Sequence, residues 1–245
     1  MKVSYSHISE KYDLARVSHN YIIDILNSYV LSNENSIHVD LGCGTCKETY
    51  TLAQRVGKFI GVDVSEEMQL VAKQRIPNGE FIKHDLQFKI PLANNFANSI
   101  SCISFYHHLT NKNYFFEESY RILASNGIFI LISNSIEQLE RRKYYDFFPT
   151  ALEINRQRFM DITVLEKLLC EIGFNITISS PIIRPPSLYG MELLSKVETP
   201  AYDSIFGLIS EDELSNGLAA MKRYFESGKK LECSRDRYFL VGHKY

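Results

Sequence analysis

The chain has 245 residues, 45% of them hydrophobic, and a formal net charge of −2. This length suits one large α/β domain with an elaboration, and the hydrophobic fraction is ordinary for a globular protein. A charge so near neutrality provides no basic field for nucleic acid, and no apolar run reaches the roughly 18 residues of a membrane span. Five cysteines, an odd number, favour reduced thiols, and the first residues lack the apolar core of a signal peptide, so we expect a cytoplasmic protein.

Predicted strands and helices alternate along the chain. Seven strands are predicted, at residues 37–41, 58–63, 80–84, 99–105, 127–133, 174–180 and 236–243. Helices are predicted at residues 14–30, 65–75 and 112–124, and from Ser210 to about Phe225. Two more helices are predicted to begin at the capping boxes Thr45-x-x-Glu48 and Thr163-x-x-Glu166, and the second of these ends at Gly173. This alternation predicts an α/β fold, a doubly wound, mostly parallel seven-stranded sheet with helices on both faces.

The most distinctive segment is an apolar strand that ends in Asp40 and continues into a turn with Gly42 and Gly44. A glycine-rich turn brings bare backbone close to a ligand because glycine has no side chain to block the approach. About 20 residues later the second predicted strand ends in Asp63, and a carboxylate there is suited to accept both hydroxyls of a ribose. The strict dinucleotide fingerprint needs a third glycine where this chain has Lys47, which disfavours a nicotinamide cofactor and an oxidoreductase.

In their order along the chain, these motifs resemble class I S-adenosylmethionine-dependent methyltransferases. The resemblance covers residues 5–180 and the last strand. Five segments match: the glycine loop, the acid Asp63 after the second strand, Asp85 after the third, residues 101–109 at the end of the fourth, and Glu117–Ile132 with Leu123 and Gly127. Cys46 stands where the family has its third glycine. The resemblance implies a Rossmann-like methyltransferase fold with S-adenosyl-L-methionine as cofactor.

The resemblance also implies roles for single residues. Asp63 is expected to bind the ribose, Asp85 the adenine amine, and Asp40 to orient the glycine loop and the methionine ammonium. Met68 is expected beside the adenine, with core packing as the alternative. The remaining residues expected at the cofactor are Tyr12, Arg16, Gly42, Gly44, Val64, Leu86 and Phe105. For Tyr12 and Arg16, the alternative is an ordinary amphipathic helix.

His107 and His108 follow the fourth strand, where the resemblance places the sulfonium. Histidine is the side chain best suited to take a proton near neutral pH, so both are candidate catalytic bases; alternatively, they only shape the pocket. Four aromatic residues are either pocket walls or core rings: Phe105, Tyr106, Tyr144 and Tyr145.

Cys43-Gly44-Thr45-Cys46 is a C-x-x-C motif, which by itself suggests a redox pair. In this chain both cysteines occupy variable positions of the glycine loop, and no second C-x-x-C completes a zinc site. We therefore predict neither redox chemistry nor a metal site.

Two stretches, residues 134–160 and 181–232, do not fit the minimal sheet. Long insertions in a compact domain usually have a function. We expect a single methyltransferase domain over residues 1–245, with a cofactor-binding half at 1–133 and the two insertions forming a helical cap over the acceptor. A packing elaboration or a dimer contact is the alternative.

The sequence therefore predicts a methyltransferase that acts on an O, N or C nucleophile of a small organic acceptor. Because the leaving group is already good, alignment of nucleophile, methyl and sulfur can supply much of the catalysis. A protein or peptide methyltransferase and a non-catalytic cofactor-binding subunit remain as alternatives. A nucleic-acid methyltransferase is disfavoured by the net charge. The acceptor atom and the oligomeric state stay open.

Overall fold

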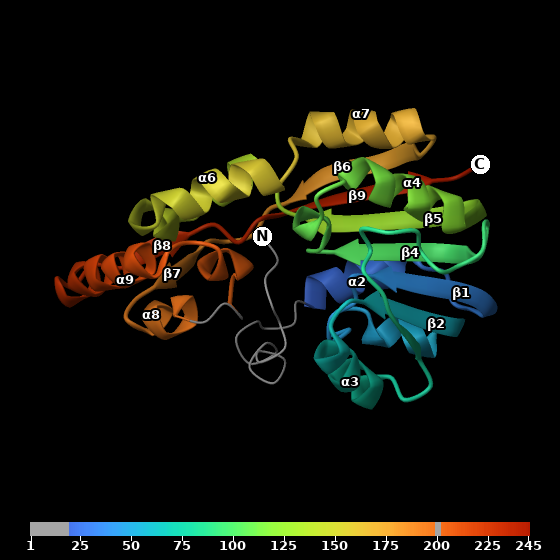
Figure 1. Ribbon diagram of the computed structural model, residues 1–245, viewed down its shortest axis with the longest axis horizontal. Helices are drawn as coiled ribbons and strands as arrows, with labels where there is room; N and C mark the ends of the chain where they lie inside the picture. The colour runs from blue at the N-terminus through green and yellow to red at the C-terminus, as the bar shows by residue number, and fades with distance from the viewer. Residues whose placement is uncertain (1–19, 199–201) are drawn as a thin grey trace.

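A seven-stranded sheet forms the centre of the computed structural model, which describes residues 20–198 and 202–245 (Figure 1). The strand order is β3-β2-β1-β4-β5-β9-β6, and β9 alone runs antiparallel to its neighbours β5 and β6. The strands are β1 (Asn33–Leu41), β2 (Val56–Asp63), β3 (Glu80–Lys83), β4 (Ala97–Ile103), β5 (Leu123–Ser133), β6 (Asn175–Ile182) and β9 (Arg237–His243). The predicted mostly parallel seven-stranded sheet is confirmed.

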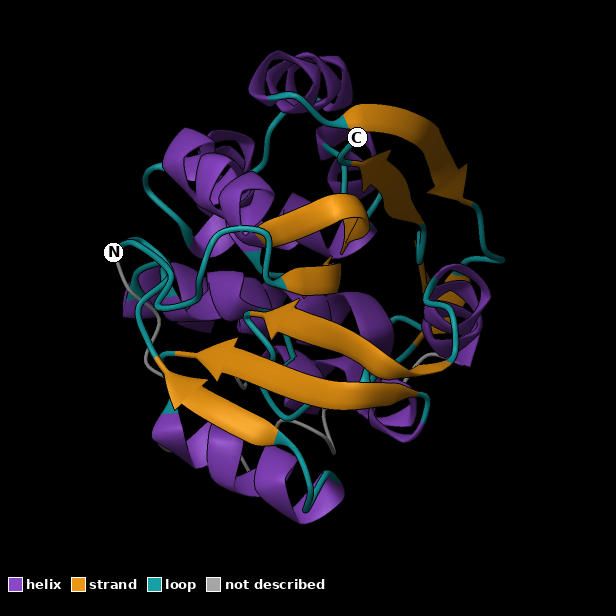
Figure 2. Ribbon diagram, turned by 90° about the vertical axis from the view of Figure 1, so that its right-hand side faces the viewer, coloured by secondary structure: helices purple, strands orange, loops and turns teal. Residues whose placement is uncertain are grey.

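Helices cover both faces of this sheet (Figure 2). They are α2 (Asn20–Tyr29), α3 (Glu66–Arg75), α4 (Lys112–Ile122) and α7 (Ile162–Ile172). Successive residues of a strand point to opposite faces, so Phe129 lies in one hydrophobic cluster with α4 and α7, and Ile130 in a second cluster with α2 and α3. The near-continuous hydrophobic run of β5 therefore packs against helices on both faces of the sheet, as expected for a doubly wound fold.

No helix begins at the predicted capping box Thr45-x-x-Glu48. The chain instead makes turns, followed by a short 3-10 helix, η1 (Tyr50–Gln54). The backbone φ angles of Gly44 and Cys46 are +49° and +54°. An α-helix of L-residues excludes positive φ angles, so the loop conformation itself prevents the predicted helix.

Two other predicted boundaries differ from the structure. The N-cap of α7 is Asp161, which accepts the Thr163 N–H at 2.8 Å, and not Thr163 as predicted. Strand β4 ends at Ile103, two residues earlier than predicted, because Ser104 has a φ of +52° and the 3-10 helix η2 (Tyr106–His108) follows. Gly173, with a φ of +120°, ends α7 as predicted.

The two insertions form one body beyond the carboxyl ends of the parallel strands (Figure 1). The first contains α5 (Ile136–Glu140), η3 (Lys143–Phe147) and α6 (Pro149–Arg158). The second contains β7 (Ser187–Tyr189), α8 (Glu192–Val197), η4 (Ser204–Gly207), α9 (Glu211–Glu226) and β8 (Leu231–Cys233). Ser210 caps α9 as predicted, but the antiparallel pair β7–β8 was not predicted, because each strand has only three residues.

The insertions pack against each other and against the sheet. Phe148 of the first insertion contacts Phe206 of the second, with ring centroids 5.1 Å apart. Both belong to the hydrophobic cluster that contains Phe129 of the sheet, so one core continues from the sheet into the insertions. Within residues 20–198 and 202–245, no helix is long and apolar enough to cross a membrane.

Candidate active site

The glycine loop after β1 is held in a conformation that L-residues rarely adopt. Gly42 has a φ of +74°, and a Cβ built on it would lie 2.1 Å from the ring of Phe105. A Cβ built on Gly44 would meet no atom within 4 Å. Gly42 therefore allows Phe105 to pack on the loop, whereas Gly44 leaves bare backbone beside open space where a ligand can approach.

Asp63 lies at the carboxyl end of β2, beside this loop. Its carboxylate accepts the backbone N–H groups of Gly44 and Ser65, each at 2.9 Å. Burial raises the pKa of Asp63, and these N–H groups oppose the rise. A carboxylate can accept about four hydrogen bonds, so Asp63 retains capacity for two hydroxyls.

Asp40 supports the loop from within the protein. It is 3% exposed, and its two oxygens accept the hydroxyls of Thr49 and Ser101, both at 2.7 Å. Burial raises its pKa to about 6, although these hydroxyls oppose the rise. Asp40 is thus already bonded on both oxygens and is placed to fix the loop.

The network continues to His38, whose ring nitrogens lie 2.8 Å from Ser99 Oγ and 3.0 Å from Ser101 Oγ. Burial lowers the pKa of His38 to about 3, so the ring is neutral. Since the Ser101 proton goes to Asp40, Ser101 must accept from Nε2–H of His38, which fixes the tautomer. The loop thus rests on an ordered buried network.

The other expected cofactor residues lie around the ends of β2, β3 and β4. Val64 is 54% exposed, and Asp85 accepts the Gln87 N–H at 3.2 Å in the turn after β3. Met68 is 3% exposed and Leu86 2% exposed, so both side chains are buried, that of Leu86 in the cluster that contains Phe129. Tyr12 and Arg16 lie outside the described residues.

The C-x-x-C motif lies inside the loop. Cys43 and Cys46 are free and buried, at 7% and 2% exposure. The hydrogen bond with Cys46, together with burial, raises the pKa of Cys43. Reactive thiols need a lowered pKa and access to solvent, so this environment does not suit redox chemistry. Among the described residues, no group of three or more His, Cys, Asp or Glu side chains is arranged to hold a metal ion.

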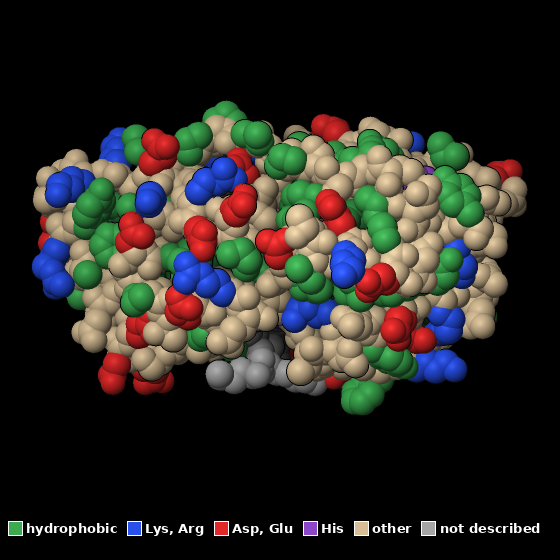
Figure 3. Space-filling model, turned by 90° about the horizontal axis from the view of Figure 1, so that it is seen from above, with side chains coloured by type: hydrophobic (Ala, Val, Ile, Leu, Met, Phe, Trp, Pro, Cys, Tyr) green, Lys and Arg blue, Asp and Glu red, His purple; other side chains and the backbone are tan. Residues whose placement is uncertain are grey.

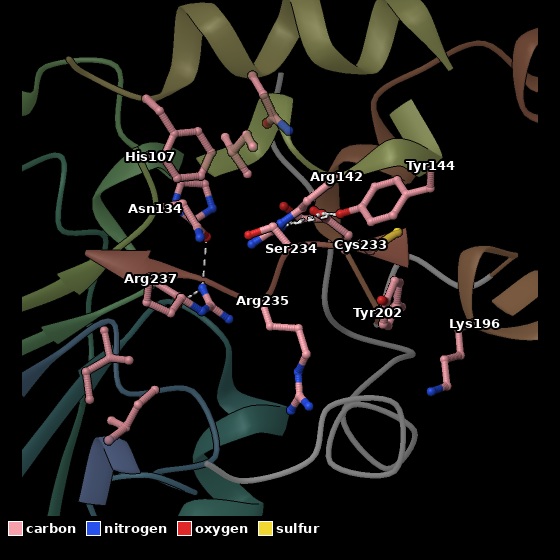
Figure 4. Close-up of a pocket in the computed structure, with 18 of the residues that line it drawn as sticks. His107, Asn134, Arg142, Tyr144, Lys196, Tyr202, Cys233, Ser234, Arg235 and Arg237 are labelled. Atoms are coloured by element: carbon pink, nitrogen blue, oxygen red, sulfur yellow. Dashed lines mark hydrogen bonds and ion pairs between the residues drawn. The ribbon is translucent and has the colours of Figure 1, made fainter. Parts of the chain in front are cut away.

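A cavity of about 220 Å³ lies between the strand ends and the insertions (Figure 4). On the sheet side it is lined by Lys47, Glu48, Ile103, Ser104, His107 and Asn134. On the insertion side it is lined by Arg142, Tyr144, Lys196, Tyr202, Asp203 and Arg235, among others. The cavity therefore connects the loop region with both insertions.

The structure separates the two candidate histidines. His107 lines the cavity and stacks on Phe159, with ring centroids 4.3 Å apart. His108 is not among the lining residues, and its Nδ1 lies 3.4 Å from a guanidinium nitrogen of Arg158. Of the pair, His107 alone lines this cavity.

The candidate aromatic residues separate in the same way. Tyr144 lines the cavity, and its hydroxyl donates to Asp203 at 3.0 Å. Tyr145 is not among the lining residues, and its hydroxyl donates to the same carboxylate oxygen of Asp203 at 3.3 Å. Tyr106 is fully buried in the core. Burial raises the pKa of Tyr144, so its hydroxyl stays protonated.

Sequence reasoning missed several cavity residues, among them Ser104, Asn134, Lys196, Arg235 and Arg237. A topological signal could have located two of these. Strand β9 runs antiparallel, so the residues just before it and at its start lie at the edge where the parallel strands end. Arg237 there donates to Ser104 Oγ at 3.1 Å and to Asn134 Oδ1 at 2.9 Å (Figure 4).

A sheet of this order, with a glycine loop after β1 and a carboxylate after β2, defines a Rossmann-like nucleotide-binding protein. A family model described as a methyltransferase domain matches residues 39–131. An uncharacterized methyltransferase of Alkaliphilus oremlandii is 21% identical over 183 residues, which cover 71% of this chain and 81% of the relative. An uncharacterized methyltransferase of a Geobacillus species is 26% identical over 189 residues, covering 71% and 86%.

Solved structures show the same fold. A putative methyltransferase from an antibiotic biosynthesis pathway of Anabaena variabilis superposes with a TM-score of 0.74 at 20% identity, covering 94% of this chain and 99% of that one. A phosphoethanolamine N-methyltransferase of Haemonchus contortus, in complex with S-adenosylhomocysteine, gives 0.58 at 16% identity, covering 98% and 57%. The chain thus resembles methyltransferases in sequence over residues 39–131 and in fold over nearly its whole length, and S-adenosylmethionine is the cofactor that this resemblance implies.

The residues of this chain fit that cofactor. Open space over Gly44, the unused acceptor capacity of Asp63 and the exposed side chain of Val64 lie together at the loop and at the end of β2. These groups would hold a nucleoside, the carboxylate by accepting its hydroxyls. When bound, the cofactor supplies a methyl group on a positively charged sulfur.

Proposed function

We propose that the enzyme methylates an O, N or C nucleophile of a small organic acceptor that binds in the cavity under the insertions. The observation that carries this proposal is the cavity of about 220 Å³ at the carboxyl ends of β4 and β5. By the same volume measure, one water needs roughly 10–15 Å³, so the space suits a small molecule. Ligands of open α/β sheets bind at this edge.

We assign the two halves of the chain different roles. Residues 1–133 form the cofactor-binding half, and the insertions 134–160 and 181–232 form the cap that holds the acceptor. In the first half, Asp63 binds the ribose, Asp85 binds the adenine amine and Asp40 orients the loop. The contributions of Tyr12 and Arg16 remain predictions from the resemblance.

Positioning is the main task of the cavity residues. The ring of His107 stacks on Phe159 and also contacts His108, whose ring centroid is 4.2 Å away. A ring held in this way can orient an acceptor, and alignment supplies much of the rate for so good a leaving group. We therefore expect His107 to shape the pocket, with proton removal as the competing role.

A small acceptor is favoured over a polymer by the shape and the charge of the protein. Peptides and nucleic acids need an open groove, and the cavity lies beneath the cap. On the face shown in Figure 3, acidic and basic side chains are interspersed, and neither sign forms a continuous field. All five cysteines are free, which supports a reducing, cytoplasmic compartment.

The experiment is a transfer assay with cofactor carrying a deuterated methyl group and a cell extract divided by ultrafiltration. We expect a labelled product in the small-molecule fraction with the wild-type protein. A reaction without enzyme provides the background, and Asp63→Ala, assayed at a low cofactor concentration, should give a reduced signal because its cofactor affinity is lowered. Label found only in protein or nucleic acid would refute the small-acceptor proposal, and label in neither fraction would favour a non-catalytic subunit.

A further inference from the structure

The cavity is more basic than the chain as a whole. Its lining contains five basic side chains and two acidic ones, a formal charge of +3 without His107, although the chain carries −2. The basic residues are Lys47, Arg142, Lys196, Arg235 and Arg237, and the acidic ones are Glu48 and Asp203. In a concave site, fixed charges of one sign raise the local concentration of oppositely charged ligands.

Two of these cations pair with the two acidic side chains of the lining. Arg142 lies 3.5 Å from Asp203, and Lys47 lies 3.6 Å from Glu48. Both acidic side chains of the lining are therefore already engaged with a cation. The excess positive charge comes from the remaining three, of which Arg237 lies at the sheet and Lys196 and Arg235 lie on the side of the second insertion.

Arg235 is the cation best placed to meet a ligand. It is half-buried and extends into the cavity (Figure 4), and it makes no hydrogen bond or ion pair with any residue in the described ranges. Lys196 also lines the cavity, and its ammonium lies 5.4 Å from the centre of the Tyr189 ring. A half-buried guanidinium that has no counter-ion among residues 20–198 and 202–245 is costly to retain with these residues alone, so a ligand that neutralises it gains binding energy.

The residue that follows Arg235, Asp236, is held by hydrogen bonds of its backbone and side chain. The Asp236 N–H donates to Ser234 Oγ at 3.2 Å, and the Asp236 carbonyl accepts from Asn134 at 3.0 Å. The Asp236 carboxylate is turned away to Arg141, at 3.1 Å, and to the Arg184 N–H, at 2.9 Å. The carboxylate of Asp236 therefore does not neutralise Arg235, and the hydrogen bonds of Asp236 fix the backbone next to Arg235.

We infer that Arg235, assisted by Lys196, forms a subsite for an oxyanion, a carboxylate or phosphate group that the methyl acceptor carries. A guanidinium presents a planar pair of donors that matches two oxygens of either group, and an ammonium adds a point charge. This inference rests on the proposed function, because it names the class of acceptor for the same cavity. It adds that the acceptor is an anion whose charged end lies toward the cap.

The test uses the full chain with S-adenosylhomocysteine at saturation, so that the cofactor site is filled. Inorganic phosphate and succinate are titrated separately by calorimetry into wild type, Arg235→Met and Arg235→Lys. The control is Arg223→Met, which removes the same charge from an exposed position of α9 outside the cavity. The two probes distinguish a preference for phosphate from one for carboxylate.

We expect at least one probe to bind the wild type and Arg223→Met equally. Arg235→Met should weaken that probe at least 10-fold, and Arg235→Lys less. Affinity for S-adenosylhomocysteine should stay within twofold in every variant. Equal probe binding by Arg235→Met, or no binding of either probe to wild type, would overturn the subsite. A matching loss of S-adenosylhomocysteine affinity would assign Arg235 to the carboxylate of the cofactor instead.

Failure of this inference is distinguishable from failure of the proposed function. The oxyanion titration needs no methyl transfer, whereas the transfer assay needs no assumption about charge. A labelled small product that is uncharged, formed equally by Arg235→Met, would overturn the subsite and leave the proposed function intact. Label confined to macromolecules would overturn the function whatever the titration showed.

Discussion

The charged side chains of the glycine loop and of the cap have different kinds of partners. In the loop region, Asp40 and Asp63 accept only from neutral donors, two hydroxyls for Asp40 and backbone N–H groups for Asp63, and burial raises the pKa of both. In the cap, Arg142 and Asp203 form an ion pair, and Arg235 extends into the cavity. In the proposed function, the backbone of the glycine loop therefore shapes the cofactor site, whereas the charge of side chains in the cap selects the acceptor.

The largest effect should follow from Gly42→Ala. Its Cβ would lie 2.1 Å from Phe105, and its φ of +74° strains any L-residue. We expect cofactor affinity to fall more than 100-fold, or the protein not to fold, as measured by S-adenosylhomocysteine titration and thermal unfolding. Gly228→Ala is the matched control, because its φ is +79° and its Cβ meets nothing within 4 Å. It should cost about 1 kcal/mol and leave binding unchanged; equal effects of the two changes would show that crowding at Phe105 is unimportant.

Asp40 should give the stability a distinctive pH dependence. Its pKa is raised from 3.8 to about 6 in the folded protein, so the fold favours the protonated carboxyl. The stabilisation is fully present below the unfolded pKa and is lost as the pH rises through about 6. Two pKa units correspond to about 3 kcal/mol, so the wild type should lose up to that amount relative to Asp40→Asn between about pH 4 and 7 in denaturant unfolding. Parallel pH profiles for the two proteins would show that Asp40 is not desolvated as described.

Asp63→Ala should weaken S-adenosylhomocysteine by roughly 1–3 kcal/mol, because ribose hydroxyls lose their acceptor. Calorimetry should show one site per chain in the wild type. Asp161→Ala serves as control, because this carboxylate caps α7 and should affect stability alone. Unchanged affinity in Asp63→Ala would remove Asp63 from the ribose site.

The histidines should differ in steady-state kinetics with the acceptor found by the transfer assay. If His107 shapes the pocket, His107→Ala should raise the Michaelis constant of the acceptor about 10-fold, with a small change in kcat, and His107→Gln should retain most of the affinity. His108→Ala should have less effect, because His108 does not line the cavity. A fall in kcat of about 100-fold that recovers at high pH would instead make His107 a base.

The smallest effect should come from Cys46→Gly. Glycine relieves the φ of +54°, but it also makes the unfolded chain more flexible. The relief of backbone strain in the folded protein and the greater entropy of the unfolded chain nearly cancel. We therefore expect the free energy of unfolding to change by less than about 1 kcal/mol and cofactor affinity to stay the same. A large loss of affinity would mean that the Cys46 side chain takes part in the site. Activity that depends on oxidation in wild type, but not in the variant with both Cys43 and Cys46 replaced, would restore the redox hypothesis.

The two regions also differ in how far the sequence predicts them. The loop could be predicted because Asp40, Gly42 and Asp63 lie at fixed distances along the chain and each has a local physical role. The mostly parallel seven-stranded sheet and its two helical layers followed from the alternation of predicted strands and helices, whereas the strand order did not. The prediction of a helix after Thr45 was wrong because Cys46 has a φ of +54°, which no capping pattern reveals.

The cap could be predicted as an insertion but not as a basic pocket. Lys196 and Arg235 lie 39 positions apart, on α8 and just before β9, and only the folded chain brings them to one cavity. Arg142 is close in sequence to Arg141, yet the two side chains meet different acids, Asp203 and Asp236. Such partners depend on long-range packing, so no local pattern distinguishes a cavity cation from a surface one.

The central claim is that the first half binds the cofactor and the cap binds the acceptor. Hydrogen exchange tests it most directly, measured on the protein alone, with S-adenosylhomocysteine, and with S-adenosylhomocysteine plus the small acceptor found by the transfer assay. We predict that S-adenosylhomocysteine slows exchange in the loops after β1 and β2, and that the acceptor further slows exchange in parts of residues 134–160 or 181–232. Identical exchange of both insertions in all three states would contradict the claim and would make them scaffold or interface.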